Sequence, residues 1–361
     1  TLIGGLAGDA LTTGGDNIAI GVNALSTEDD HGRNVAIGRD ALKLQDAGAD
    51  AYNTAIGYVA GANVTTGVNN TLIGGLAGDA LDTGNNNTAL GYNALGQETK
   101  GDRNVAVGAH ALVTQNNTSN VDSYNTGVGY AAGTAMTTGI KNTLIGGLAG
   151  DALTTGSNNT ALGYGALSTE DGHGRNVAIG SSALTTLNAG QDAYNIGIGY
   201  NAGYAMTLGV QNVIIGGLAG DSLTSGNYNT AIGYAALSLE DAHGTNVAIG
   251  RAALNVQNAG ADAHNVAVGY NAGVAVTTGI QNTLLGGQAG DSLTTGSYNV
   301  AIGFEALSSE DSGGRNVAIG RLALKDLDAG DVGYNVAIGF NAGENVSTGL
   351  QNTILGGLAG D

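Results

Sequence analysis

The sequence predicts an all-β protein, a parallel β-solenoid made of about 21 short coils. The 361 residues include 65 Gly, no Pro, no Cys and only 11% charged residues, whereas globular proteins average about 7% Gly and 25% charged residues. Motifs ending in Gly recur along the whole chain about every 17–19 residues, and such a period is the signature of a repeat architecture. A unit of this length is too short for two helices and a turn, and its Gly and β-branched residues disfavour a helix.

The coils are grouped in a longer repeat. The Gly that closes each Ala-Ile-Gly-like triplet stands at positions 4, 21, 38, 57 and 74, and this cycle of steps then recurs, with one exceptionally long step between Gly108 and Gly129. Superrepeats of about 70 residues therefore start near positions 1, 71, 143, 213, 283 and 353, each of them one structural unit. We expect residues 1–361 to form a single continuous solenoid. Because the chain begins and ends within the same motif without a cap, we also expect a segment of a longer repeat protein.

Each coil follows the consensus Asn-(Thr/Val)-Ala-(Ile/Leu)-Gly-x-x-Ala. We expect two short strands per coil, and coils stacked about 4.8 Å apart would give a rod on the order of 100 Å long. Asn in every coil predicts a ladder of amide hydrogen bonds and an αL turn at that Asn, while the invariant Gly predicts a close backbone approach. Representative ladder positions are Asn34, Asn53, Asn176 and Asn316, with Gly38, Gly57, Gly180 and Gly320.

The alternation of side chains along a strand predicts which residues face the interior. In the strand at residues 53–57, Thr54 and Ile56 lie on one face, whereas Ala55 and Gly57 lie on the other. We expect the bulkier Thr and Ile to fill the coil. The Ala/Gly face would then be smooth and suited to close packing against another chain, which favours a homo-oligomer, and a trimer in particular.

Charge and motif spacing argue against several function classes. A formal net charge of −19 disfavours nucleic acid and anionic membrane surfaces, and no apolar stretch is long enough to span a membrane. Ser, His and Asp occur without the spacing of a catalytic triad or a nucleophile elbow. Every candidate surface also recurs about five times, whereas catalysis needs one specialised cleft. We therefore expect a protein that is not an enzyme and has no cofactor.

Acidic loops follow the second and third coils of each superrepeat. Carboxylates on adjacent coils are candidates for Ca²⁺, which prefers six to eight oxygen ligands; the candidates are Asp29, Asp46, Asp171 and Asp192. The alternative is a solvated acidic rim that keeps the rod soluble. One loop position also holds His31, His173 and His243. Four coils, or about 19 Å, separate successive members, so they do not ligate a common metal.

Aromatic residues follow the invariant Gly in many coils, as at Tyr58, Tyr92, Tyr164, Tyr200 and Tyr234. One interpretation is packing, in which each aromatic ring covers the bare backbone of a Gly in a neighbouring coil. The other is a ladder of Tyr and Arg that stacks on sugar rings, which makes these five residues possible glycan contacts.

The motif resembles the head repeats of YadA-type trimeric autotransporter adhesins, whose pattern is Asn-Ser-Val-Ala-Ile-Gly. Residues 34–38 (Asn-Val-Ala-Ile-Gly) and 316–320 match it most closely, and residues 229–236 are similar to repeats of phage tail-fibre-like proteins. The resemblance implies a left-handed parallel β-roll, a homotrimer, and a location outside the cell, on a bacterial or virion surface. The present coils are a few residues longer than those of the family.

These observations favour the structural shaft of an extracellular fibre, either a bacterial adhesive appendage or a phage tail fibre, that acts as a rigid spacer and self-associates as a homotrimer or filament. An alternative is a glycan- or receptor-binding surface along the rod for cell adhesion. A third is ice binding, which would use Thr pairs such as Thr12–Thr13 and Thr65–Thr66; these occur in only two of every four coils.

Overall fold

The computed structural model describes all 361 residues, and it confirms the predicted fold class: an all-β parallel solenoid with one turn about every 17 residues. The chain divides into two compact units, residues 1–176 and residues 177–361, and we describe each by itself. The single continuous solenoid expected for residues 1–361 stays a prediction.

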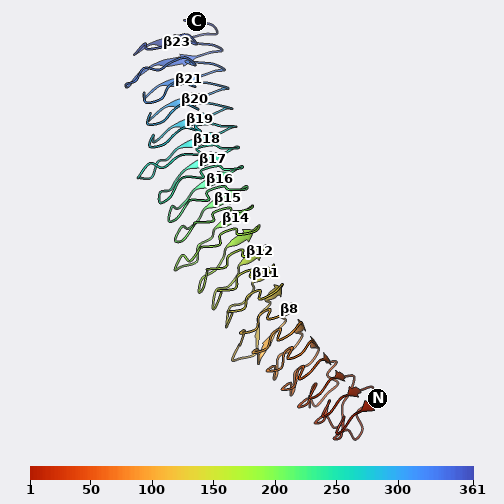
Figure 1. Cartoon of the computed structure of the whole chain (residues 1–361). Coiled ribbons are helices and arrows are strands. Elements are labelled where there is room, and N and C mark those ends of the chain that lie inside the picture. Colours follow the sequence, from red (N-terminus) through yellow and green to blue (C-terminus); the bar gives the residue numbers. More distant parts are fainter. The chain divides into compact units, whose positions relative to one another are not determined.

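The first unit contains a parallel sheet with one strand from each coil (Figure 1). Neighbouring strands keep the same register, so that Ile18 pairs with Val35 and Val35 with Thr54. The strands are β1 (Leu2–Ile3), β2 (Ile18–Ile20), β3 (Val35–Ile37), β4 (Thr54–Ile56), β5 (Thr71–Ile73), β6 (Thr88–Leu90), β8 (Val105–Val107), β10 (Thr126–Val128), β11 (Thr143–Ile145) and β12 (Thr160–Leu162).

The second unit repeats this arrangement, again with parallel pairing of each strand with the strand of the next coil. Its strands are β13 (Val177–Ile179), β14 (Ile196–Ile198), β15 (Val213–Ile215), β16 (Thr230–Ile232), β17 (Val247–Ile249), β18 (Val266–Val268), β19 (Thr283–Leu285), β20 (Val300–Ile302), β21 (Val317–Ile319), β22 (Val336–Ile338) and β23 (Thr353–Leu355).

The prediction of two strands per coil is wrong for most of the chain. A second short sheet occurs only between β7 (Gly101–Asp102) and β9 (Val121–Asp122), with one isolated bridge from Gly314 to Val332. The reason lies in the backbone after the invariant Gly, where alternate residues such as Asp40 and Leu42 have φ of 57° and 47°. A strand needs consecutive residues in the β region, and these left-handed residues interrupt it.

The predicted orientation of the strand is also wrong. The middle Ala of the strand points into the coil: Ala55 has no exposed surface, whereas Thr54 and Ile56 are only partly buried. The coil is narrow and its interior is already occupied by Leu side chains from the turns, so only a small residue fits at most of the inward strand positions. The outer face of the sheet is therefore formed by Thr, Val and Ile rather than by Ala and Gly.

Four residues after the invariant Gly, the core position holds Leu in two consecutive coils and Gly in the next two, as at Leu25, Leu42, Gly61 and Gly78. A Cβ added at Gly61 would lie 2.6 Å from Leu72 Cδ1 and 3.1 Å from Leu42 Cδ2, so Leu side chains of the coils on both sides fill the space above and below that Gly. A Cβ at Gly78 would likewise lie 2.8 Å from Leu72 Cδ2. Interiors pack at nearly crystalline density, so each Leu requires a small partner.

A column of buried asparagines joins the coils. Within each unit, the Oδ1 of each Asn accepts the backbone N–H of the Asn in the next coil, at 3.0 Å from Asn34 to Asn17 and 3.1 Å from Asn53 to Asn34. The Nδ2 of Asn53 donates to the backbone O of Gly67 at 2.7 Å. Asn176 and Asn316 make the same backbone contact to the preceding coil. The αL residue is the one before the Asn, such as Tyr52 (φ 56°), and not the Asn itself as predicted.

The invariant Gly is required for two separate reasons. Its φ lies near +135°, for example 137° at Gly38 and 145° at Gly57, a region that L side chains rarely adopt. A Cβ at Gly57 would also lie 2.3 Å from the backbone O of Gly74 in the next coil. Gly180 and Gly320 have the same backbone conformation, with φ of 132° and 138°. Stacking at this corner is therefore backbone against backbone.

We predict that Gly57→Ala destabilises the protein strongly, by about 2–5 kcal/mol, because the new Cβ meets both a forbidden φ and the carbonyl of Gly74. The free energy of unfolding from urea titration measures this effect. The matched control is Gly15→Ala, where no atom lies within 4 Å of the added Cβ and a change within about 0.5 kcal/mol is expected. Equal effects of the two substitutions would contradict this account of the Gly column.

Candidate functional site

The outer sheet face is the first candidate surface. We define it as the outward strand residues together with the residue after each invariant Gly and the residue before each ladder Asn. The five Tyr residues singled out in the sequence lie on it with 54% to 64% of their surface exposed, at Tyr58, Tyr92, Tyr164, Tyr200 and Tyr234. The first and third residues of most strands are half-buried. The face is thus an apolar strip bordered by aromatic and charged side chains.

The aromatic residues after the invariant Gly pack against their neighbours. A Cβ at Gly147 would lie 3.5 Å from Tyr164 Cδ2, and one at Gly217 would lie 3.6 Å from Tyr234 Cδ2, so the rings cover bare Gly backbone. Arg251 lies 6.0 Å from the ring centroid of Tyr234, within reach of a cation–π contact. Tyr234 thus has neighbours in the coils on both sides, and about half of its surface stays exposed to solvent.

A second aromatic column was missed from the sequence. It is formed by the residue before each ladder Asn, where Arg and Tyr often occupy adjacent coils. The guanidinium of Arg33 lies 5.4 Å from the ring centroid of Tyr52, and that of Arg103 lies 5.5 Å from Tyr124. The signal was available in the sequence, because these residues stand at one fixed offset from the Asn.

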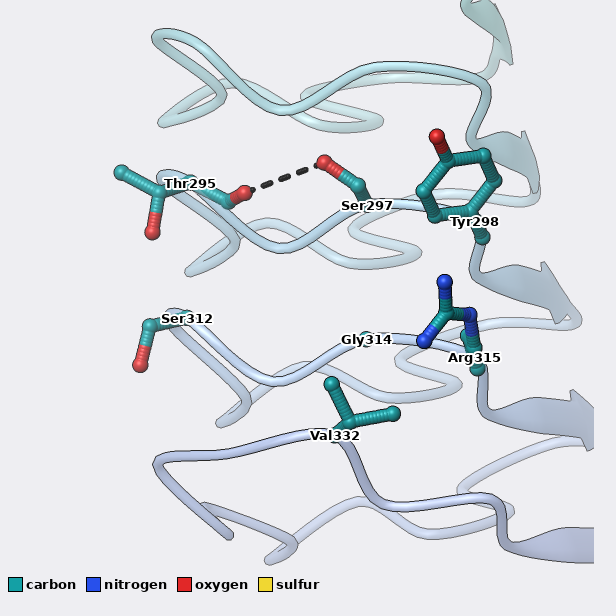
Figure 2. A pocket seen from close by; sticks show the side chains of 7 residues that line it. All are labelled: Thr295, Ser297, Tyr298, Ser312, Gly314, Arg315 and Val332. Atoms are coloured by element: carbon teal, nitrogen blue, oxygen red, sulfur yellow. Dashed lines mark hydrogen bonds between the residues drawn. The ribbon is translucent and has the colours of Figure 1, made fainter.

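A hollow of about 170 Å³ opens on this second column in the second unit (Figure 2). Arg315 lies between two rings, 5.3 Å from the centroid of Tyr298 and 5.6 Å from that of Tyr334. Thr295, Ser297, Ser312, Gly314 and Val332 complete its lining. The hollow therefore combines one aromatic ring, that of Tyr298, with hydroxyl groups and one cation.

The acidic loops are the second candidate site, and their description as a solvated rim is wrong in one respect. The Glu at the eleventh position after the ladder Asn is fully buried in the second coil of every superrepeat, at Glu28, Glu98, Glu170, Glu240 and Glu310. In the first and fourth coils the same position holds a buried apolar residue, such as Leu81 or Val64. This column of the core thus accepts one carboxylate in each superrepeat.

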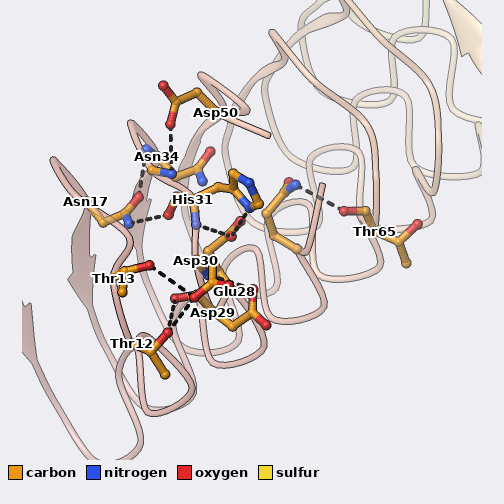
Figure 3. A network of polar contacts seen from close by, with 12 residues as sticks. Thr12, Thr13, Asn17, Glu28, Asp29, Asp30, His31, Asn34, Asp50 and Thr65 are labelled. Carbon is orange, nitrogen blue, oxygen red and sulfur yellow. Dashed lines mark hydrogen bonds and ion pairs between the residues drawn. The ribbon is translucent and has the colours of Figure 1, made fainter. Parts of the chain in front are cut away.

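The buried Glu residues differ in their hydrogen bonds. The Oε1 of Glu98 accepts three backbone N–H groups of its own loop, including that of Gly101 at 2.7 Å, and its Oε2 accepts Gln115 Nε2 at 2.9 Å and Asn117 Nδ2 at 3.0 Å. The Oε1 of Glu28 accepts a single hydrogen bond, from the backbone N–H of His31 at 3.1 Å, and its Oε2 has no hydrogen-bond partner. Figure 3 shows this loop with its neighbours Asp29 and Asp30.

Burial changes the acidity of several carboxyls. Desolvation raises the pKa of Glu240 to about 7, and it also raises the pKa of Glu28 and Glu310 above the ordinary value. Loss of solvent likewise raises the pKa of four aspartates at the end of the Gly-Gly-Leu/Gln-Ala-Gly-Asp runs, namely Asp79, Asp151, Asp221 and Asp291. Each of these four has a buried Oδ1 without a hydrogen-bond partner.

The candidate Ca²⁺ ligands divide between the acidic loops. Asp29 groups with Glu28 and His31, and Asp171 groups with Glu170 and His173; the ligand atoms of each group lie within 4.8 Å of one another. Neither group includes Asp46 or Asp192. Asp46 instead donates its backbone N–H to the O of Thr65. For these four residues the structure thus brings together neighbours within one loop. Carboxylates on adjacent coils do lie together in the fifth superrepeat, where Asp311 and Asp328 group with Glu310.

We predict that the four half-buried aspartates make the protein less stable at neutral pH. Their folded-state pKa is raised above the unfolded value of about 3.9, so the folded state binds more protons and stability falls as pH rises through the folded pKa. Replacing all four (Asp79→Asn, Asp151→Asn, Asp221→Asn and Asp291→Asn) should raise Tm at pH 7. The gain should shrink as pH falls toward the unfolded pKa of about 3.9, because the folded-state carboxyls are then protonated and the unfolded ones are becoming so.

Thermal melts between pH 4 and pH 7 measure this difference. Asp9→Asn is the matched control, because Asp9 occupies the same motif position but is exposed, and it should leave Tm unchanged at every pH. A quadruple variant that follows the parent's pH profile without any offset would show that these carboxyls carry no penalty.

Comparison with known proteins assigns no family to this chain. No protein-family model matches the chain, and no curated protein matches it either. No helix in the structure combines the length and apolar character needed to cross a membrane.

Proposed function

We propose that this chain is the structural shaft of an extracellular fibre, on a bacterial or virion surface, and that it acts as a rigid spacer. The observation that carries the proposal is the constant hydrogen-bond register from coil to coil within each unit. Every strand pairs with the next at equivalent residues, as Val213 does with Thr230 and Thr230 with Val247. Each added coil therefore lengthens the molecule by one strand spacing, about 4.8 Å.

The same contacts favour rigidity. In most coils the corner is fixed by a buried Asn bonded to backbone in two directions, as Asn282 is to Asn299 N at 2.9 Å and to Gly296 O at 2.8 Å. Bending the stack would break these buried bonds, and an unsatisfied buried polar group costs about 1–3 kcal/mol. A net charge of −19 keeps such a molecule soluble.

Self-association through the outer sheet face completes the proposal. Because the Thr, Val and Ile strip is the side of the sheet that faces solvent, it replaces the Ala/Gly face as the surface that packs against another chain. The occupant that fits is a second copy of this chain, as in a homotrimer or filament. Its own strip has the same coil spacing and the same four-coil cycle, so apolar rows and aromatic columns match along the contact.

Deletion of one superrepeat tests the spacer role. Removing residues 213–282 joins Asn212 to Thr283 and restores the motif across the junction. We expect a folded, equally stable protein whose long dimension in electron micrographs is shorter by about 19 Å, or four strand spacings.

The control deletion removes residues 213–247, which joins Asn212 to Ala248 one residue out of register. It should destabilise the solenoid, because a one-residue shift turns every strand side chain to the opposite face. An unchanged length, or equal stability of the two deletions, would count against a shaft built from interchangeable coils.

A second candidate function is glycan binding, and the hollow at Tyr298 and Arg315 favours it. Exposed rings can stack on sugar faces, while the hydroxyls of Ser297 and Ser312 can bond to sugar hydroxyls. On a glycan array, the chain should bind at least one glycan, and Tyr298→Ala should weaken binding at least tenfold. Tyr204→Ala, an exposed Tyr outside the hollow, should leave it unchanged. If the chain binds no glycan, the spacer role would remain as its one proposed function.

A further inference from the structure

Three loops of the chain share a Glu-Asp-x-His sequence. They follow β2, β12 and β16, and they contain Glu28, Asp29 and His31; Glu170, Asp171 and His173; and Glu240, Asp241 and His243. In each loop one ligand atom from each of the three residues lies within 4.8 Å of the other two. One imidazole nitrogen and two carboxylate oxygens therefore converge at three equivalent places.

The distances within each group fit a bound cation better than a direct contact. His31 Nδ1 lies 3.8 Å from Glu28 Oε1, and the equivalent distance is 3.6 Å at both His173 and His243. Hydrogen bonds require about 3.2 Å or less. Two ligands of a tetrahedral Zn²⁺, each about 2.0–2.2 Å from the metal, lie about 3.3–3.5 Å apart. A shift of a few tenths of an ångström would bring each His–Glu pair into that geometry. The Asp oxygen has to move farther, since it lies 4.0 Å from the Nδ1 in the His243 loop and within 4.8 Å of the other ligand atoms in the other two loops.

Buried polar atoms without partners point into these groups. Glu28 and Glu240 have no exposed surface, and the Oε2 of each has no hydrogen-bond partner. The Nδ1 atoms of His31, His173 and His243 are also buried without a hydrogen bond. Buried polar atoms are almost always paired in folded proteins, so their recurrence at one place in three loops needs an explanation.

The electrostatic surroundings favour a cation. Asp29 and Asp46 lie near Glu28, and Asp241 lies near Glu240, so at least one further carboxylate lies beside each of these buried Glu side chains. A divalent ion would offset both the repulsion between these carboxylates and the cost of burying one of them.

We propose that each Glu-Asp-x-His loop binds one divalent transition-metal ion, with Zn²⁺ as the best fit, through the His Nδ1 and one oxygen from each carboxylate. Imidazole nitrogen with carboxylate oxygen suits Zn²⁺, whereas Ca²⁺ takes oxygen ligands and larger coordination numbers. Each site is local to one coil and holds a single His. It therefore ties the loop to the core without linking distant superrepeats.

The chain supplies its own comparison loops. In the second superrepeat, the carboxylate of Glu98 is occupied by backbone and amide donors, and its loop reads Glu-Thr-Lys-Gly without His. In the fifth, Glu310 groups with Asp311 and Asp328 of the next coil but with no His, and its Oε atoms accept backbone N–H groups at 2.7 and 3.2 Å. The proposal thus assigns three ions to a chain with five superrepeats.

Zinc titration of the full chain, freed of metal by chelation, tests the assignment. Calorimetry and elemental analysis should give three Zn²⁺ per chain, and millimolar Ca²⁺ should not displace them. His31→Gln, His173→Gln and His243→Gln should each remove one ion, and the triple variant should remove all three. His110→Gln and His264→Gln are the matched controls, since both lie outside the three loops, and they should retain three ions.

A second measurement does not depend on any variant folding. Imidazole nitrogen resonances of the parent chain should shift on addition of Zn²⁺ at the Nδ1 of three His residues and stay unchanged at the other two. Absence of stoichiometric Zn²⁺, retention of ions by the triple variant, five ions per chain, or displacement by Ca²⁺ would each overturn the proposal.

Discussion

The stacked asparagines impose the constraint on which the rest of the structure depends. Each buried Asn accepts the backbone N–H of the next Asn, and in most coils its Nδ2 also donates to a carbonyl at the end of its own coil, as Asn70 does at Asn87 N and Gly84 O. This pair of bonds fixes both the register between coils and the closure of the coil. The Nδ2 of Asn34, Asn246 and Asn316, each in the third coil of a superrepeat, has no such partner. The Asn–Asn bond forms whether the two asparagines are 17, 19 or 21 positions apart, because extra residues enter only the loop that precedes the second Asn.

Because the Asn bonds hold the coils tightly closed, their interior is narrow, and this explains why the chain is rich in Gly and Ala. The backbone of one Gly lies against the carbonyl of the Gly in the next coil, and an Ala faces inward in most strands because Leu from the turns already fills the space. Where the strand places a Leu inside, as at Leu72, the turn has Gly78 in place of Leu. The abundance of Gly and Ala is thus the consequence of tight stacking, since a coil this small has room for about one large side chain at each level.

The sequence was sufficient to predict the solenoid, the coil boundaries and the Asn and Gly columns, because each follows from periodicity. It was not sufficient for the direction of the strand faces. Alternation shows that Ala55 and Ile56 point to opposite sides, but only the volume left by Leu42 and Leu72 determines which side is inside. The burial of Glu28 was missed for a related reason. A Glu beside Asp29 and Asp30 resembles a solvated loop, and only its fixed offset from Asn17, shared with Leu81 and Val64 in other coils, indicates a core position.

The four-coil cycle explains why a repetitive scaffold can still carry distinct sites. The Asn and Gly columns are the same in every coil, so they leave the eleventh position after the Asn free to vary between Leu, Glu, Gln, Val and Met. A carboxylate there is tolerated because the loop that follows supplies donors, completely around Glu98 and incompletely around Glu28. In both cases the next coil has a Gln at the same position, but Gln115 donates to Glu98 whereas Gln45 donates to Thr65 O. Asn117 also bonds to Glu98, and Ala47 stands at the equivalent position beside Glu28, where His31 lies 3.8 Å away with its Nδ1 unbonded. One buried position therefore carries either a purely structural group or a cation ligand, depending on neighbours that the Asn ladder does not constrain.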